Sequence, residues 1–172
     1  SKEWDKAIPA FQKSLSENPG KAGTWYMLGQ CYRFCGEISK SIEALENATS
    51  INKKDAHIFL ALGISYQLAE KFDKSLQSLR SATLIDPDYD LAYNSAGLTF
   101  RKMGNAKKAL ETYDKAIGAN IRSYLKKMVN DQRQEVIGFI NLGTEITLEY
   151  IIENAIAHAV TNQYKIKKIV LP

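Results

Sequence analysis

The pattern of large apolar and small residues along the first two thirds of the chain repeats with a period of 34 residues, which separates Trp25 from Phe59 and Phe59 from Tyr93. Each of these aromatic residues is followed by an apolar residue at the third position, glycine at the fourth and another aromatic residue at the seventh. Positions with these spacings share one face of an α-helix. The pattern therefore predicts amphipathic helices near residues 22–35, 56–69 and 90–103.

A second helix is predicted in each period. A small residue, a large residue four positions later and an alanine three positions further on recur in register: Ser41, Leu45 and Ala48, then Ser75, Leu79 and Ala82, then Ala109, Tyr113 and Ala116. The glycine of the first helix has no Cβ, so a partner helix can approach it closely. We expect these second helices near 38–51, 72–84 and 106–118, and residues 3–17 fit the second helix of a preceding pair.

A single helix pair cannot bury its own apolar face, so a fixed period of this size predicts that the pairs stack on one another. Gly36 and Gly104 mark turns inside two of the pairs, and Pro87 marks the end of a second helix. The large side chains at the repeating positions should form the core: Trp25, Leu28, Tyr32, Leu45, Phe59, Leu62, Tyr66, Leu79, Tyr93, Phe100 and Tyr113.

This order of residues, W-x2-L-G-x2-Y followed by A-x3-F and P, resembles the tetratricopeptide repeat family. Residues 22–55, 56–89 and 90–123 resemble three full repeats, and residues 2–19 resemble the end of a preceding one. The resemblance implies an all-α fold, a right-handed α-α superhelix (TPR solenoid) over residues 1–121, whose concave face is lined by the first helix of each repeat. Since the chain opens within a repeat, we expect it to be part of a longer protein.

The repeat pattern stops after Ser123, because Lys127 and Asp131 stand where an aromatic residue and glycine are required. Apolar spacing still predicts a C-terminal pair of longer helices, near 123–141 and 145–162, so residues 122–172 are expected to be a helical cap or a dimerisation segment. The second of these helices has a wide apolar stripe. It can cap the solenoid, join two copies in a homodimer through residues 145–162, or fill the concave groove.

Composition and charge narrow the choice of partner. The chain has 172 residues, of which 45% are hydrophobic and 24% charged, and its net charge is +4. Basic residues are scattered, apart from Lys165, Lys167 and Lys168 near the end, and no apolar run approaches the roughly 20 residues needed to cross a bilayer. We therefore expect no nucleic-acid partner, no membrane partner and a cytoplasmic location.

The residues able to carry chemistry are few. Cys31 and Cys35 lie four positions apart, but the remaining candidate ligands, His57 and His158, are distant in the sequence, and a structural zinc site requires four ligands. Cys31 occupies a small-residue position of the repeat, where a free cysteine packs as a small hydrophobe. No nucleophile with an orienting base and no phosphate-binding glycine loop is evident. We predict no cofactor, no metal and no enzyme activity.

The exposed side of the first helices is the expected partner-binding surface, because it remains after the packing positions are removed. Its residues are Tyr26, Met27, Gln30, Arg33, Phe34, His57, Leu60, Ile64, Gln67, Leu68, Leu91, Asn94, Leu98, Arg101 and Lys102. The family members that grip acidic chaperone tails carry Lys, Asn and Arg at positions that here hold Tyr26, Gln30, Ala61, Leu91 and Ser95. Binding of such a tail is therefore not expected.

These observations predict a non-catalytic scaffold that binds a peptide or helix on its concave first-helix face. Two alternatives are a substrate-recruiting repeat segment of a larger enzyme and a small secretion-type chaperone. The apolar character of the surface favours contact with another molecule, although the chain's own C-terminal segment is a second candidate for covering it.

Overall fold

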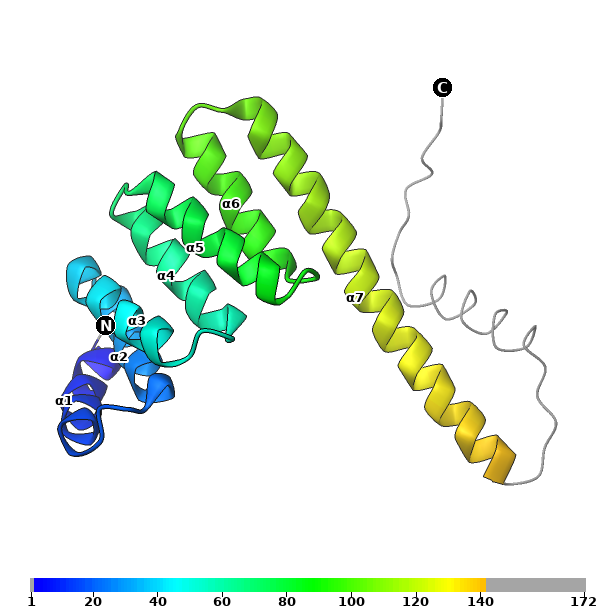
Figure 1. Ribbon diagram of the computed structural model, residues 1–172, viewed down its shortest axis with the longest axis horizontal. Helices are drawn as coiled ribbons and strands as arrows, with labels where there is room; N and C mark the ends of the chain where they lie inside the picture. Colours follow the sequence, from blue (N-terminus) through cyan, green and yellow to red (C-terminus); the bar gives the residue numbers. More distant parts are fainter. Residues whose placement is uncertain (1, 142–172) are drawn as a thin grey trace. The chain divides into compact units, whose positions relative to one another are not determined.

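The computed structural model describes the backbone of residues 2–141 and most side chains as far as residue 127 (Figure 1). All the regular secondary structure in this part of the chain is α-helical. Its helices are α1 (Lys2–Glu17), α2 (Ala22–Phe34), α3 (Ile38–Ile51), α4 (Ala56–Leu68), α5 (Phe72–Ile85), α6 (Asp90–Lys102) and α7 (Ala106–Asn141). The first six lie within one residue of the helices predicted from the sequence.

The prediction of a break between residues 118 and 123 is wrong, because α7 continues through this stretch. The preceding repeat ends just before Pro87, but Ile121 occupies the equivalent position here and can extend a helix. The predicted helix 145–162, with its three possible roles, lies outside the described residues. The first compact unit of the chain is Ser1–Asn120, and the following description concerns that unit.

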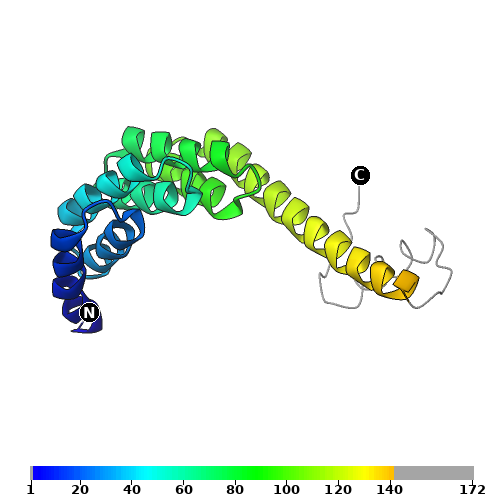
Figure 2. The same ribbon diagram turned by 60° about the horizontal axis from the view of Figure 1, so that its bottom comes forward.

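The helices of this unit pack as successive antiparallel pairs. We call α2, α4 and α6 the first helices; α3, α5 and the start of α7 are their second helices, while α1 precedes the first full pair. The first helix α2 contacts its second helix α3, and α4 contacts α5, while Gly97 of α6 lies against Tyr113 of α7. Neighbouring first helices also contact one another. Figure 2 shows α1 to α6 as a stack of helices. The described region is therefore an α-α solenoid.

Turns inside the pairs need a backbone conformation that favours glycine. Gly36 and Gly104 have φ angles of 82° and 77°, and Glu70 has a φ of 57° at the equivalent place in the second repeat. This left-handed conformation costs a residue with a Cβ about 1 kcal/mol. The second repeat thus keeps the turn geometry of the other two without their glycine.

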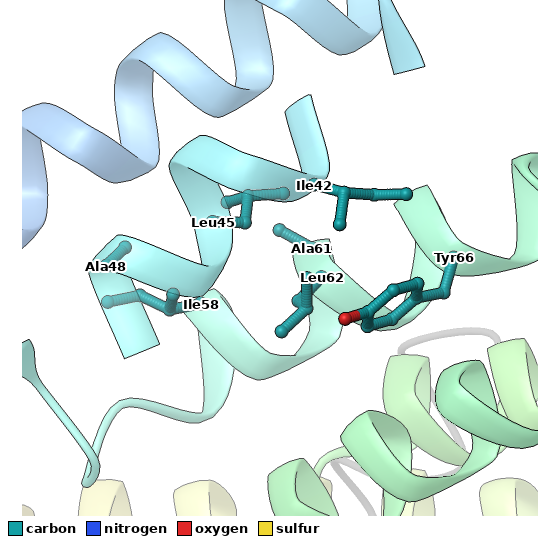
Figure 3. Packing of buried hydrophobic residues seen from close by; sticks show 7 residues of the cluster. All are labelled: Ile42, Leu45, Ala48, Ile58, Ala61, Leu62 and Tyr66. Atoms are coloured by element: carbon teal, nitrogen blue, oxygen red, sulfur yellow. The ribbon is translucent and has the colours of Figure 1, made fainter. Parts of the chain in front are cut away.

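The core lies between the helices of neighbouring repeats. Ile42 and Leu45 of α3 point toward Leu62 and Tyr66 of α4 in one cluster of buried side chains (Figure 3). Six of the predicted core residues are buried: Leu28, Tyr32, Leu45, Leu62, Tyr66 and Leu79. The other five are only half-buried: Trp25, Phe59, Tyr93, Phe100 and Tyr113.

Buried hydroxyl groups also connect neighbouring repeats. The Oγ atoms of Ser41 and Ser65 lie 2.9 Å apart, and the Oγ of Ser75 lies 3.3 Å from Oγ1 of Thr99. In both pairs the second helix of one repeat is bonded to the first helix of the next. Because buried polar groups are costly without partners, these pairs favour one register of stacking.

We predict that Leu62→Ala lowers the free energy of unfolding by about 2–5 kcal/mol, since the side chain is 5% exposed and its removal leaves a cavity. Urea denaturation followed by circular dichroism measures this change. Leu84→Ala is the matched control, because Leu84 is 71% exposed and should cost less than about 0.5 kcal/mol. Similar losses for the two variants would contradict the assigned core.

Candidate partner-binding site

The predicted surface residues lie on α2, α4 and α6, which neighbour one another in the stack. We call this side of the unit the first-helix face. Its exposed residues are Met27, Phe34, His57, Leu68, Leu91, Asn94, Arg101 and Lys102, and its half-buried residues are Tyr26, Gln30, Arg33, Ile64 and Leu98. The face combines large apolar groups with cations near the C-terminal ends of α2 and α6, where positive charge is favourable.

The prediction that Leu60 and Gln67 lie on the exposed surface is wrong. Both are buried, with exposures of 8% and 5%. Leu60 packs in a cluster with Ala92 of α6. The Nε2 of Gln67 donates hydrogen bonds to the carbonyl oxygen of Ser95 at 3.1 Å and to Oγ1 of Thr99 at 2.6 Å. Direct packing between neighbouring first helices removes these two side chains from the surface.

The polar side chains of α2 are held in fixed positions by one another. Gln30 Nε2 donates to the hydroxyl oxygen of Tyr26 at 3.0 Å, while its Oε1 accepts from Nε and Nη2 of Arg33 at 2.9 and 2.6 Å. The guanidinium carbon of Arg33 also lies 4.3 Å from the centre of the Phe34 ring. Burial lowers the pKa of Arg33 from its usual value, and the nearby Tyr26 opposes this effect.

Two aromatic residues that the sequence prediction missed extend this arrangement. Trp4 of α1 stacks on Phe34 with ring centres 4.7 Å apart. Tyr89, just before α6, has its hydroxyl oxygen 2.5 Å from Nδ1 of His57, so the starts of α4 and α6 are joined. Burial is the largest cause that raises the pKa of Tyr89. Trp4 lies before the first full repeat, and Tyr89 lies just before α6. Neither residue therefore occupies one of the repeating positions of the first helices from which the surface was predicted.

Grouped metal ligands and membrane-spanning helices are both absent from the described region. Within it, no three His, Cys, Asp or Glu residues are grouped so that they can hold a metal ion. Nor does any described helix combine the length and apolar character that crossing a bilayer requires.

The two cysteines are free thiols in different surroundings. Cys31 is fully buried, and burial raises its pKa. A hydrogen bond with Asp5 is the main cause that raises the pKa of Cys35 to about 11. Both groups are therefore neutral near pH 7, which fits packing better than thiolate chemistry.

Comparison with known proteins agrees with this repeat geometry. A family model described as tetratricopeptide repeat matches residues 1–63, and another with the same description matches residues 91–120. Together the two stretches cover more than half of the chain. The structure defines a helical-repeat solenoid of the kind that serves as a protein-interaction scaffold. The chain belongs to the tetratricopeptide repeat family.

Solved structures of MamA are similar to this fold. The structure titled "Crystal structure of MamA" is 25% identical, with a TM-score of 0.67, over 70% of this chain and 71% of that chain. A structure of MamA residues 41 to the end from Desulfovibrio magneticus RS-1 is 20% identical, with a TM-score of 0.66, over 70% of this chain and 68% of that one. At 20% identity, the similarity to the second structure supports a shared fold and nothing further. A comparison with curated protein sequences gives no match.

We predict that Cys35 reacts with iodoacetamide at pH 7.5 roughly two orders of magnitude more slowly than cysteine in an unstructured peptide, because its pKa of about 11 leaves little thiolate. Asp5→Asn removes the main cause of the raised pKa and should accelerate the reaction. Mass spectrometry of the alkylated protein measures both rates. Reaction of the unaltered Cys35 at the rate of the peptide would contradict this assignment.

Proposed function

We propose that this chain is a non-catalytic scaffold that binds a peptide or helix along its first-helix face. The observation that carries the proposal is the set of large apolar side chains that this face exposes. Met27, Phe34, Leu68 and Leu91 are 41%, 49%, 46% and 54% exposed. Apolar groups gathered on neighbouring helices are stabilised when a partner excludes water from them.

The polar groups of the face support recognition of a partner in one orientation. Tyr26, Gln30 and Arg33 already form a hydrogen-bonded network, so little side-chain freedom remains to be lost on binding. Arg101 and Lys102 supply positive charge at the far end of α6. A partner with an apolar stripe and an acidic residue near one end complements this arrangement, as an amphipathic helix does.

The proposed site contains the predicted residues that remain on the surface, with Trp4 and Tyr89 added and Leu60 and Gln67 removed. The stacked ring of Trp4 places α1 next to the apolar part of the face. Tyr89 holds His57 at the boundary between the second and third repeats. We also propose a protein rather than a nucleic-acid partner, because the net charge of the chain is only +4.

We predict that Met27→Glu/Leu68→Glu weakens binding of a peptide ligand by about tenfold or more, since each change places a charge in the apolar contact. Ligands are obtained by selecting a phage-displayed random peptide library on the unaltered protein. Synthetic copies are then measured by fluorescence polarisation.

The control for this prediction is Ile51→Glu/Leu84→Glu, which adds the same two charges at exposed positions of α3 and α5. It should keep the affinity of the unaltered protein, and circular dichroism should show that both variants are folded. If the control loses as much affinity as the first-helix variant, or if neither loses any, the proposed face is wrong.

A further inference from the structure

Clefts with equivalent lining residues recur along the solenoid, each bordered by the first and second helices of a repeat. The first copy lies beside α1, α2 and α3, has a volume of about 440 Å³ and includes Tyr32 and Lys40. The second copy, of about 300 Å³, includes the equivalent residues Tyr66 and Lys74. The third copy, of about 510 Å³, lies among α5, α6 and α7. The same feature of the repeat therefore has three different sizes.

One pair of positions distinguishes the three clefts. In the first, Nε2 of Gln12 donates to the hydroxyl of Tyr32 at 2.9 Å, and in the second the hydroxyl of Tyr66 donates to Glu46. The equivalent residues of the third cleft are Arg80 and Phe100. Because Phe100 has no hydroxyl group, this hydrogen bond cannot form in the third cleft, although Arg80 and Phe100 both line it.

The charge of the third cleft also differs. Arg80 and Lys115 line it, and Nζ of Lys108 lies 5.7 Å from the centre of the Phe100 ring. No carboxylate is among the described residues of its lining. Glu43 by contrast lines the first cleft, where Lys40 is paired with Glu37, and the second cleft is lined by a single cation, Lys74. Excess cations in a partly enclosed site favour an anion.

The floor of the third cleft is apolar. Leu79 is fully buried, and half-buried Tyr93, Ala96 and Phe100 surround the space. The hydroxyl of Thr83 donates to the carbonyl of Arg80, and that of Thr112 donates to the carbonyl of Lys108 at 2.6 Å. The groups that can still donate to a ligand are the side chains of Arg80, Lys115 and Gln77 and the hydroxyl of Tyr93.

We infer that this third cleft is a binding site for a carboxylate attached to an aromatic or branched aliphatic group. The guanidinium of Arg80 matches the two oxygens of a carboxylate, and Lys115 adds a second cation. The apolar body of the ligand covers Phe100 and its neighbours. Inorganic phosphate supplies the charge but leaves this floor exposed to water. The site is separate from the first-helix face and does not depend on the function proposed for it.

The test is a titration of the ¹⁵N-labelled 172-residue chain with N-acetylphenylalanine, followed by two-dimensional NMR. Shifts should concentrate at residues of α5, α6 and the start of α7. N-acetylphenylalaninamide, which has the same ring without the charge, should bind about tenfold more weakly, as expected for loss of a charge-assisted hydrogen bond. A peptide that ends in phenylalanine with a free carboxyl group distinguishes a chain terminus from a small free acid as the better ligand.

Arg80→Gln and Lys115→Gln should each weaken binding of N-acetylphenylalanine about threefold to tenfold, while Lys53→Gln, at an exposed position away from the cleft, should leave it unchanged. Phe100→Tyr should also weaken binding, because it gives Arg80 the hydroxyl partner that the other repeats have. Equal affinity for the acid and the amide, or unchanged affinity in both cation variants, would overturn the inference.

Discussion

The close approach of two helices at a glycine is the contact on which the rest of this structure depends. A Cβ placed at Gly29 would lie 2.6 Å from Cγ of Leu45, and one at Gly63 would lie 2.6 Å from Cγ of Leu79. At Gly97 the nearest atom, Cε1 of Tyr113, is at 2.5 Å. Real Cβ atoms do not pack at such distances. The missing side chain therefore sets the spacing within each pair, and equal spacing allows the pairs to stack.

Regular stacking leaves other positions free to differ between repeats without loss of the fold. One position of the repeat holds Gln12, Glu46 and Arg80 in successive copies. The position paired with it holds Tyr32, Tyr66 and Phe100. The first two pairs are hydrogen-bonded, which ties one repeat to the next. The third pair is not, and its cleft is the largest of the three. The same reasoning applies to the first-helix face, where Phe34, Leu68 and Lys102 occupy one equivalent position.

Much of the fold follows from the period of the sequence, since the positions of Trp25, Gly29 and Tyr32 indicate both a helix face and a close neighbour. The burial of Leu60 and Gln67 could not be predicted from the sequence period. A single-helix pattern shows which residues share a side, but it does not show that α4 and α6 touch across that side. The continuation of α7 was missed for a different reason, because the end of a repeat was expected where no residue stops the helix.

The exposure of apolar residues on the first helices was predictable, but the arrangement of the polar groups beside them was not. The first helices were expected to expose an apolar surface, and Met27, Phe34 and Leu68 do so. The fixed positions of Gln30 and Arg33 arise from hydrogen bonds between side chains one helical turn apart, for which their residue types gave only a weak signal. Trp4 and Tyr89 come from outside the repeating positions. Their contribution required knowledge of how successive helices meet.

The central claim, that the glycine contact sets the helix spacing, is tested most directly by a double-mutant cycle at Gly63 and Leu79. The free energy of unfolding is measured by urea denaturation for Gly63→Ala, Leu79→Ala, the double variant and the unaltered chain. In the presence of Leu79, Gly63→Ala should be destabilising, because its new methyl group overlaps the leucine side chain. With alanine at position 79 the same change should cost at least about 1 kcal/mol less, since the overlap is removed. An equal cost in the two backgrounds would contradict the account.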